Sequence, residues 1–189
     1  MSRLVIGIVL GVALVPLGVL GWFHLGFPPV AVADKPFPME EQLAHSALAH
    51  RIAHDAKQQP SIPADESNLV SGAEVYRDSC AACHGFHSKP STFAAHMVPQ
   101  APQLWEKHGK NGIVGVSDDP PVVTYWKVAN GIRLTGMPAY RNVLTDREIW
   151  QVSLLLANAA KPLPVGALVI LRPTTSPALP EGLEQKPKP

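Results

Sequence analysis

The chain is short of cysteine and of charge. Charged residues make up 16% of its 189 residues and the formal net charge is +1 at pH 7, so it lacks the basic surplus with which proteins bind nucleic-acid phosphates. Cys80 and Cys83 are its only cysteines, and they cannot supply a zinc site of four thiolates, since such a site would need a second pair of ligands at finger-like spacing. These shortages argue against a nucleic-acid partner and against a zinc module.

The two cysteines belong to a single motif, Cys80-Ala81-Ala82-Cys83-His84. A C-x-x-C-H run is the attachment signal of a c-type haem. The two thiols are spaced to add to the two vinyl groups of one porphyrin, and the adjacent imidazole is then placed to act as the proximal iron ligand. The motif predicts one covalently attached haem c, held by Cys80, Cys83 and His84.

Other uses of a C-x-x-C pair fit this sequence less well. A thioredoxin-like dithiol opens a helix after a buried strand, and nothing before Cys80 has the pattern of such a strand. A disulfide in so short a loop leaves His84 without a role. A second C-x-x-C-H run, which a dihaem peroxidase would need, is absent from the sequence.

One long apolar run stands at the start, from residue 4 to residue 27, interrupted only by His24. At about 1.5 Å rise per residue, a helix of this length can cross a hydrocarbon core of about 30 Å. Arg3 precedes the run and no basic cluster follows it, so the positive-inside rule predicts a cytoplasmic N-terminus and an exported remainder facing the periplasm or the cell exterior. An A-x-A pattern at residues 31–33 keeps a cleaved signal peptide as the alternative.

Proline and composition divide the chain into four parts. Residues 1–28 are predicted as the membrane anchor or signal peptide, 29–68 as a stalk helix and linker, 69–161 as the globular domain and 162–189 as a proline-rich tail. The tail is expected to be extended. Its apolar patch at residues 165–171 either folds back on the domain or docks on a partner subunit.

Two polar clusters outside the motif are candidates for chemistry. His50 and His54 are four residues apart on the predicted stalk helix and could share a metal ion, but no third ligand is nearby, so a solvated polar face is favoured. Asp118 and Asp119 precede two prolines and predict a solvated turn. No catalytic acid, base or nucleophile is assigned.

The domain is expected to begin and end with helices. The first covers residues 69–79, where Gly72 and Tyr76 lie four residues apart and allow a close backbone approach beside an aromatic contact. The last begins at Thr145, because Thr145 and Glu148 match a capping box. The helix after Thr145 is strongly apolar and must pack against the rest of the domain.

These landmarks together resemble a known family. Gly72 and Tyr76 precede the C-x-x-C-H motif, and Gly136-Met137-Pro138 precedes a terminal helix with Trp150. This order is similar to that of a class I cytochrome c, over about half of the chain. The resemblance implies an all-α, cytochrome c-like helical domain around one haem, here preceded by a single transmembrane helix. It also implies that the first and last helices cross, with Gly72 and Tyr76 near Trp150.

The distal ligand is chosen among two methionines and three histidines of the domain, which are Met97, Met137, His87, His96 and His108. His87 is too close to His84 in the chain to reach the opposite haem face, and His96 or Met97 would need a tight loop. Met137 is far enough along the chain, and its setting is similar to the ligand loop of class I cytochromes. Met137 is therefore the expected ligand, and a bis-histidine haem is the alternative.

The resemblance also implies a support for the proximal imidazole. A ligating histidine usually donates its other N–H to a carbonyl. Ala101-Pro102-Gln103-Leu104 resembles the proline-containing segment that serves this purpose in the family. The Pro102 carbonyl is the expected acceptor for His84.

The predicted ligation indicates the function. An iron held on both faces by His84 and Met137 has no open site for a substrate, and such a centre transfers single electrons. The sequence thus predicts an electron-transfer protein and not an enzyme, working between respiratory or dehydrogenase partners. Two alternatives stay open: a fixed subunit of an oxidase, quinol-oxidising or dehydrogenase complex, and a haem-based gas sensor or enzyme with an open iron site.

Overall fold

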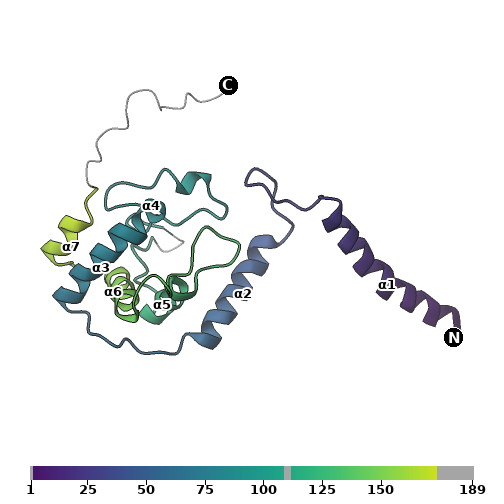
Figure 1. The fold of residues 1–189 in the computed structure, drawn as a ribbon, viewed down its shortest axis with the longest axis horizontal. Coiled ribbons are helices and arrows are strands. Elements are labelled where there is room, and N and C mark those ends of the chain that lie inside the picture. The colour runs from purple at the N-terminus through teal and green to yellow at the C-terminus, as the bar shows by residue number, and fades with distance from the viewer. Residues whose placement is uncertain (1, 109–111, 174–189) are drawn as a thin grey trace, which may run out of the picture. The chain divides into compact units, whose positions relative to one another are not determined.

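The computed structural model describes residues 2–108 and 112–173. Within these ranges the chain is helical, and the only β-type pairings are two isolated bridges. The chain divides into two compact units, Met1–Leu48 and Ala49–Pro189. The all-α class predicted from the sequence is confirmed (Figure 1).

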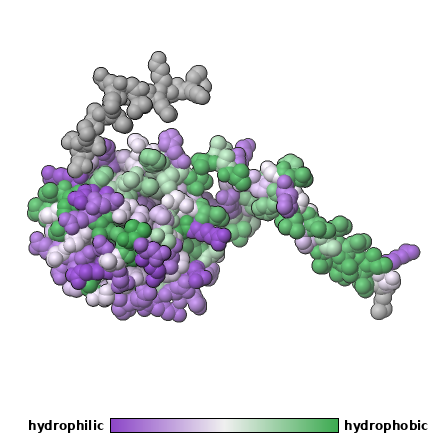
Figure 2. All heavy atoms as spheres, viewed as in Figure 1, coloured by the Kyte–Doolittle hydropathy of each residue, from purple (hydrophilic) through white to green (hydrophobic). Residues whose placement is uncertain are grey.

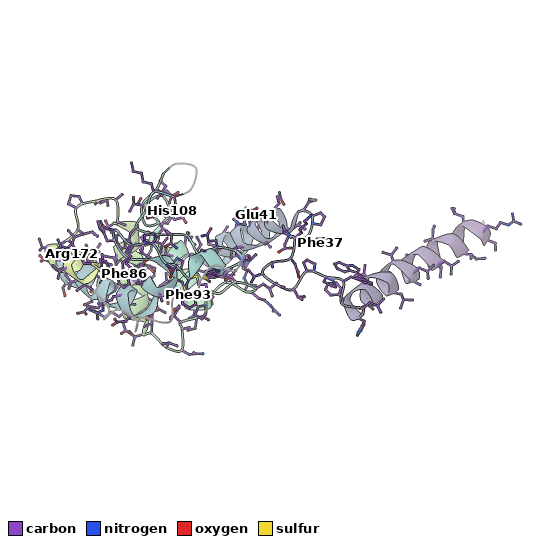
Figure 3. The ribbon with its side chains drawn as sticks, turned by 90° about the horizontal axis from the view of Figure 1, so that it is seen from above. Phe37, Glu41, Phe86, Phe93, His108 and Arg172 are labelled. Atoms are coloured by element: carbon purple, nitrogen blue, oxygen red, sulfur yellow. The ribbon has the colours of Figure 1, made fainter. Side chains whose placement is uncertain are left out.

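The first unit contains helix α1, Ser2–His24, none of whose side chains is buried. Figure 2 shows apolar side chains around this helix. Among the described residues it is the one helix long and apolar enough to cross a membrane, which fits the predicted anchor. Phe37, labelled in Figure 3, follows in the chain. Its ring centroid lies 5.8 Å from that of Trp22.

Helix α2, Glu40–Asp55, ends inside the second unit. Ile52 is buried there, and the Asp55 carboxylate accepts a hydrogen bond of 3.3 Å from the indole N–H of Trp126. The end of the predicted stalk is therefore attached to the globular unit. These contacts make the packed unit begin earlier in the chain than the predicted boundary at residue 69. The prediction missed them because no pattern in the sequence marks them.

The core of the second unit is the packing of α3, Glu66–Ser79, against α6, Asp146–Ala157. The predicted capping box is present at the start of α6, where Thr145 and Glu148 bond to each other's backbone N–H. Gly72 of α3 lies so close to the backbone of α6 that no Cβ would fit between them. The close approach expected at Gly72 is thus observed.

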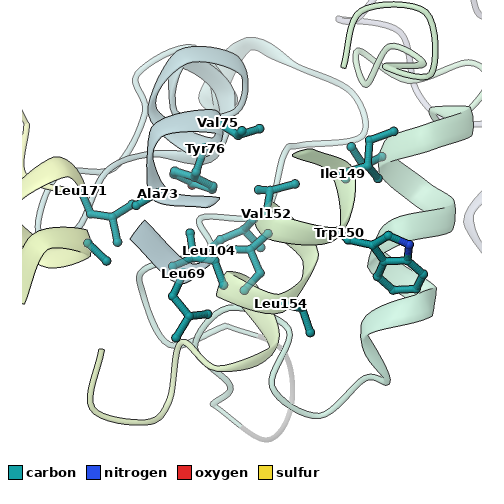
Figure 4. Packing of buried hydrophobic residues seen from close by; sticks show 14 of the residues in the cluster. Leu69, Ala73, Val75, Tyr76, Leu104, Ile149, Trp150, Val152, Leu154 and Leu171 are labelled. Carbon is teal, nitrogen blue, oxygen red and sulfur yellow. The ribbon is translucent and has the colours of Figure 1, made fainter. Parts of the chain in front are cut away.

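The aromatic partners differ from those implied by the family resemblance. Tyr76 is fully buried and meets Trp105 edge to face, with 5.5 Å between ring centroids. Trp150 stacks on Tyr125 instead, with centroids 4.2 Å apart and an interplanar angle of 27°. Figure 4 shows the Trp150 indole turned away from Tyr76. The ring that stacks on Trp150 comes from α5, Pro121–Asn130, and not from Tyr76, whereas Gly72 does lie against Gln151, next to Trp150 in the chain.

The apolar patch after the predicted domain forms a helix, α7, Val165–Ile170, that packs against α3. Ala167 and Leu171 are completely buried. The Leu171 carbonyl accepts a 3.2 Å hydrogen bond from the His87 N–H. The extended conformation expected here was wrong, because the patch covers apolar surface on α3, and of the two alternatives it folds back. The remainder of the predicted tail, residues 174–189, lies outside the described residues.

Candidate haem site

The C-x-x-C-H motif forms a single helical turn at the end of α3. Helix α4, Ala81–His84, begins after Cys80, and the N–H groups of Cys83 and His84 donate to the Cys80 carbonyl at 3.2 and 2.9 Å. Both cysteines are free thiols and both line one pocket together with His84. The turn therefore presents two thiols and an imidazole to the same space.

The thiol chemistry differs from that of a catalytic dithiol. Burial, with a smaller effect of the neighbouring Cys83, raises the pKa of the Cys80 thiol to about 12. Reactive cysteines in redox motifs have a pKa below the ordinary value instead. No strand precedes the motif in the described part of the chain. The thioredoxin alternative therefore lacks both the strand before the motif and the lowered thiol pKa that it requires.

The imidazole of His84 is oriented by a backbone carbonyl. Its Nδ1 lies 2.9 Å from the Pro102 oxygen, and Nδ1–H donates to that oxygen. Burial lowers the pKa of His84, although the hydrogen bond to Pro102 opposes this shift. A neutral imidazole whose Nδ1 is engaged presents the lone pair of Nε2, the form in which histidine binds a metal. The contact expected between His84 and Pro102 is present in the structure.

The methionine loop follows α5 and is shaped by its own hydrogen bonds. The Ile132 N–H donates to the Met137 carbonyl at 3.2 Å, and the Met137 N–H donates to the Thr135 hydroxyl at 3.1 Å. Gly131 opens the loop at φ +66°, and the backbone at residues 137–139 leaves no room for a side chain on it. The loop places Met137 on the lining of the same pocket as His84.

The pocket encloses about 670 Å³ of empty space, part of which is open to solvent. Apart from the motif, its walls are mainly apolar, with residues such as Val128, Ile132 and Pro99, although Ser79, Gln100, Thr135 and Tyr140 also line it. Of the candidate distal ligands, the lining includes Met97 and Met137, and among the described residues it includes none of His87, His96 or His108. The structure thus leaves the two thioethers as the distal candidates.

These residues fit a haem c. The two thiols and the imidazole come from one turn, the thioethers come from other segments, and the space between them has apolar walls, as a porphyrin requires. In the described part of the chain, His84 is the one imidazole on the lining, so bis-histidine ligation has no second ligand there.

The other predicted cluster has a different character. His54 is bonded through Nδ1 to the Asp55 carboxylate at 2.8 Å, and no group of three or more metal-binding side chains occurs in the described ranges. His50 and His54 are both exposed, as a solvated polar face requires.

Sequence reasoning missed two residues of the site. Gln103 hydrogen-bonds to the motif and to a neighbouring loop, and Tyr140 donates from its hydroxyl to the Ser79 carbonyl at 2.6 Å. Gln103 directly follows Pro102, which is the one sequence signal that could have pointed to it. Tyr140 gives no such signal, because its partner is far away in the chain.

Comparison with known proteins gives one family. No curated protein and no solved structure matches the chain. The model of the family described as Cytochrome C oxidase, cbb3-type, subunit III matches residues 67–154, which include the motif, α5, the methionine loop and most of α6. Residues 67–154 are therefore similar to this family, and the chain carries a class I c-type cytochrome domain.

Proposed function

We propose that the chain is a monohaem, membrane-anchored cytochrome that carries single electrons. Cys80 and Cys83 bind one haem covalently, and His84 and Met137 ligate its iron. The observation that carries the proposal is that His84, held by Pro102, and Met137, held by its loop, line one apolar pocket.

The residues of the pocket perform three tasks in this function. Pro102 keeps the His84 ring in the tautomer that offers Nε2 to the iron. Met137 would supply the second protein ligand to the iron, which would leave no position open for a substrate. The apolar walls keep water away, and together with the thioether they favour the reduced state. The haem supplies the change between ferric and ferrous iron, and the protein supplies no acid–base step.

The partners follow from the anchor and the family. We place the haem domain on the exported side of the membrane, tethered by α1, where it exchanges electrons with respiratory or dehydrogenase proteins. Nothing in the charge balance of the chain favours a nucleic-acid partner. A cleaved signal peptide remains the alternative to the anchor, and the mass of the mature protein distinguishes the two.

A second candidate is a permanent cytochrome subunit of a respiratory complex. The family match favours it, because the printed description of that family is an oxidase subunit. Purification of the tagged full chain in mild detergent separates the candidates: a stoichiometric membrane complex supports the fixed subunit, and a monomeric cytochrome supports the carrier.

The ligation is tested by optical spectroscopy of the full chain produced with haem-maturation machinery. The oxidised protein should show the weak near-infrared band of an iron–thioether bond. Met137→Ala should abolish the band, and Met97→Ala should keep it. A reduced protein that does not bind CO supports the closed iron site. If the band disappears in Met97→Ala and persists in Met137→Ala, the assignment is wrong. Rapid CO binding by the parent would favour the gas-sensor or enzyme alternative.

A further inference from the structure

The side chain of Gln103, which follows the pocket-lining residues Ala101 and Pro102 in the chain, uses both ends of its amide. Its Nε2 donates to the carbonyls of Cys83 and Ala101, each at 3.1 Å. Its Oε1 accepts from the Ser91 N–H at 2.6 Å. Two carbonyls at one end and an N–H at the other determine the orientation of the amide, because only one arrangement satisfies all three.

The Nε2 end lies on the proximal side of the site. Cys83 immediately precedes His84, and Ala101 immediately precedes Pro102, whose carbonyl accepts from the His84 ring. The next residue, Leu104, donates its N–H to the His84 carbonyl at 3.1 Å. Gln103 and Leu104 therefore clamp the motif against the segment that carries the Pro102 carbonyl.

The Oε1 end reaches a loop that leads to the other side of the pocket. Ser91 also donates its hydroxyl to the Ala82 carbonyl and accepts from the Phe93 N–H at 3.1 Å. The short helix η1, Ala94–His96, follows, and then Met97. The methyl group of Met97 fills the space beside Gly136, next to Met137 in the chain.

Space for the amide depends on Gly85. This residue has φ +78°, and a Cβ on it would lie 2.7 Å from the Gln103 Oε1. The backbone after His84 is thus shaped so that the amide can approach. The conformation of Gly85, directly after the motif, thus accommodates the Gln103 side chain, so the hydrogen bonds of Gln103 belong to the structure of the site.

We propose that Gln103 is a positioning residue that couples the support of the proximal histidine to the loop that packs Met97 on the Met137 segment. The proposal rests on the proposed haem ligation. Gln103 itself touches neither the iron nor a substrate. It holds the Pro102 carbonyl through Cys83 and Ala101, and it holds the Met97 loop through Ser91.

Two variants separate the two ends of the amide. Gln103→Leu removes all three hydrogen bonds, whereas Gln103→Glu keeps an acceptor for Ser91 and loses the donor for both carbonyls. The matched control is Gln151→Leu, which loses a buried bond of 3.1 Å to Asn68 in the core, at a residue that is not on the pocket lining.

The experiment uses the haem-loaded full chain in detergent and two readouts. NMR of the reduced protein follows solvent exchange of the His84 Nδ1 proton, and optical titration of the oxidised protein follows the pH at which the iron–thioether band is lost. In Gln103→Leu we expect the His84 Nδ1 proton to exchange about tenfold faster, because about one net hydrogen bond's worth of stabilisation is lost. We also expect the iron–thioether band to be lost at a pH about one unit lower. In Gln103→Glu we expect the faster exchange with little change in the band.

The control decides between positioning and general stability. Gln151→Leu should lower the unfolding midpoint and leave both readouts as in the parent. The proposal is overturned if Gln103→Leu behaves like Gln151→Leu, or if only one of its two readouts changes. A parent protein without the band would refute Met137 ligation. The exchange rate of the His84 Nδ1 proton would then be the one readout that tests the role of Gln103.

Discussion

The Cα of Gly72 in α3 lies against the backbone carbonyl of Gln151 in α6, at a distance that excludes any side chain. The two helices are the main packing pair of the domain, and α3 continues directly into the C-x-x-C-H turn. The contact therefore determines how the motif is positioned relative to the last helix.

Gly72→Ala should lower the free energy of unfolding by about 1–3 kcal/mol, because the added methyl group would overlap backbone atoms that cannot move without separating the helices. Chemical denaturation of the haem-loaded protein measures the change. Glu74→Ala, exposed on the same helix, is the control and should change it by less than about 0.5 kcal/mol. Equal effects of the two variants would mean that the close approach is not needed.

The two glycines of the methionine loop should respond differently to alanine. Gly131 has a positive φ, and a Cβ there would lie 2.7 Å from the backbone at Pro138 and Ala139. Gly136 would instead meet the flexible end of Met97. We expect Gly131→Ala to cost about 1–3 kcal/mol and to weaken the iron–thioether band, and Gly136→Ala to be tolerated better. Denaturation and the optical spectrum test this order, and the reverse order would contradict it.

Leu171→Ala should destabilise the domain although residue 171 lies beyond the family match. The side chain is fully buried beside α3, and such a truncation typically costs about 2–5 kcal/mol. Val169→Ala, which is exposed in the same segment, is the control. An unchanged unfolding midpoint in Leu171→Ala would mean that α7 does not contribute to the core in solution.

The hydrogen bond from Trp126 of α5 to Asp55 of α2 should weaken in acid. The hydrogen bonds from His54 and Arg51, in that order, lower the pKa of Asp55 to about 2, with a smaller contribution from Trp126. A depressed pKa stabilises the folded form above the ordinary value of 3.8, and this contribution is lost as the pH falls toward 2. The NMR signal of the Trp126 indole N–H should shift over this interval in the parent.

Asp55→Ala provides the control for that titration. The variant should show no acid shift of the Trp126 signal, while the Trp150 indole should be unaffected in both proteins. A Trp126 signal that titrates in the variant as it does in the parent would assign the effect to another group.

Local features of the domain could be predicted from the sequence. The capping box at Thr145 is a short-range hydrogen-bond pattern, and α1 is recognisable from the length of its apolar run. Gly72 could be recognised because a glycine on an otherwise side-chain-bearing helix indicates a close approach. The partners of Trp150 and Tyr76 were missed, because aromatic pairing depends on the side from which α5 packs.

The sequence alone predicted the chemistry: the order Cys80, Cys83, His84 has the spacing of a haem-attachment motif, and the sequence holds no other pair of cysteines. The tertiary structure decided which side chains meet across long chain separations. It brought Met97 and Met137 to one pocket, fitted Gln103 between the motif and the Ser91 loop, and folded α7 onto α3. Those contacts depend on the packing of apolar surfaces, which has no local signature in the chain.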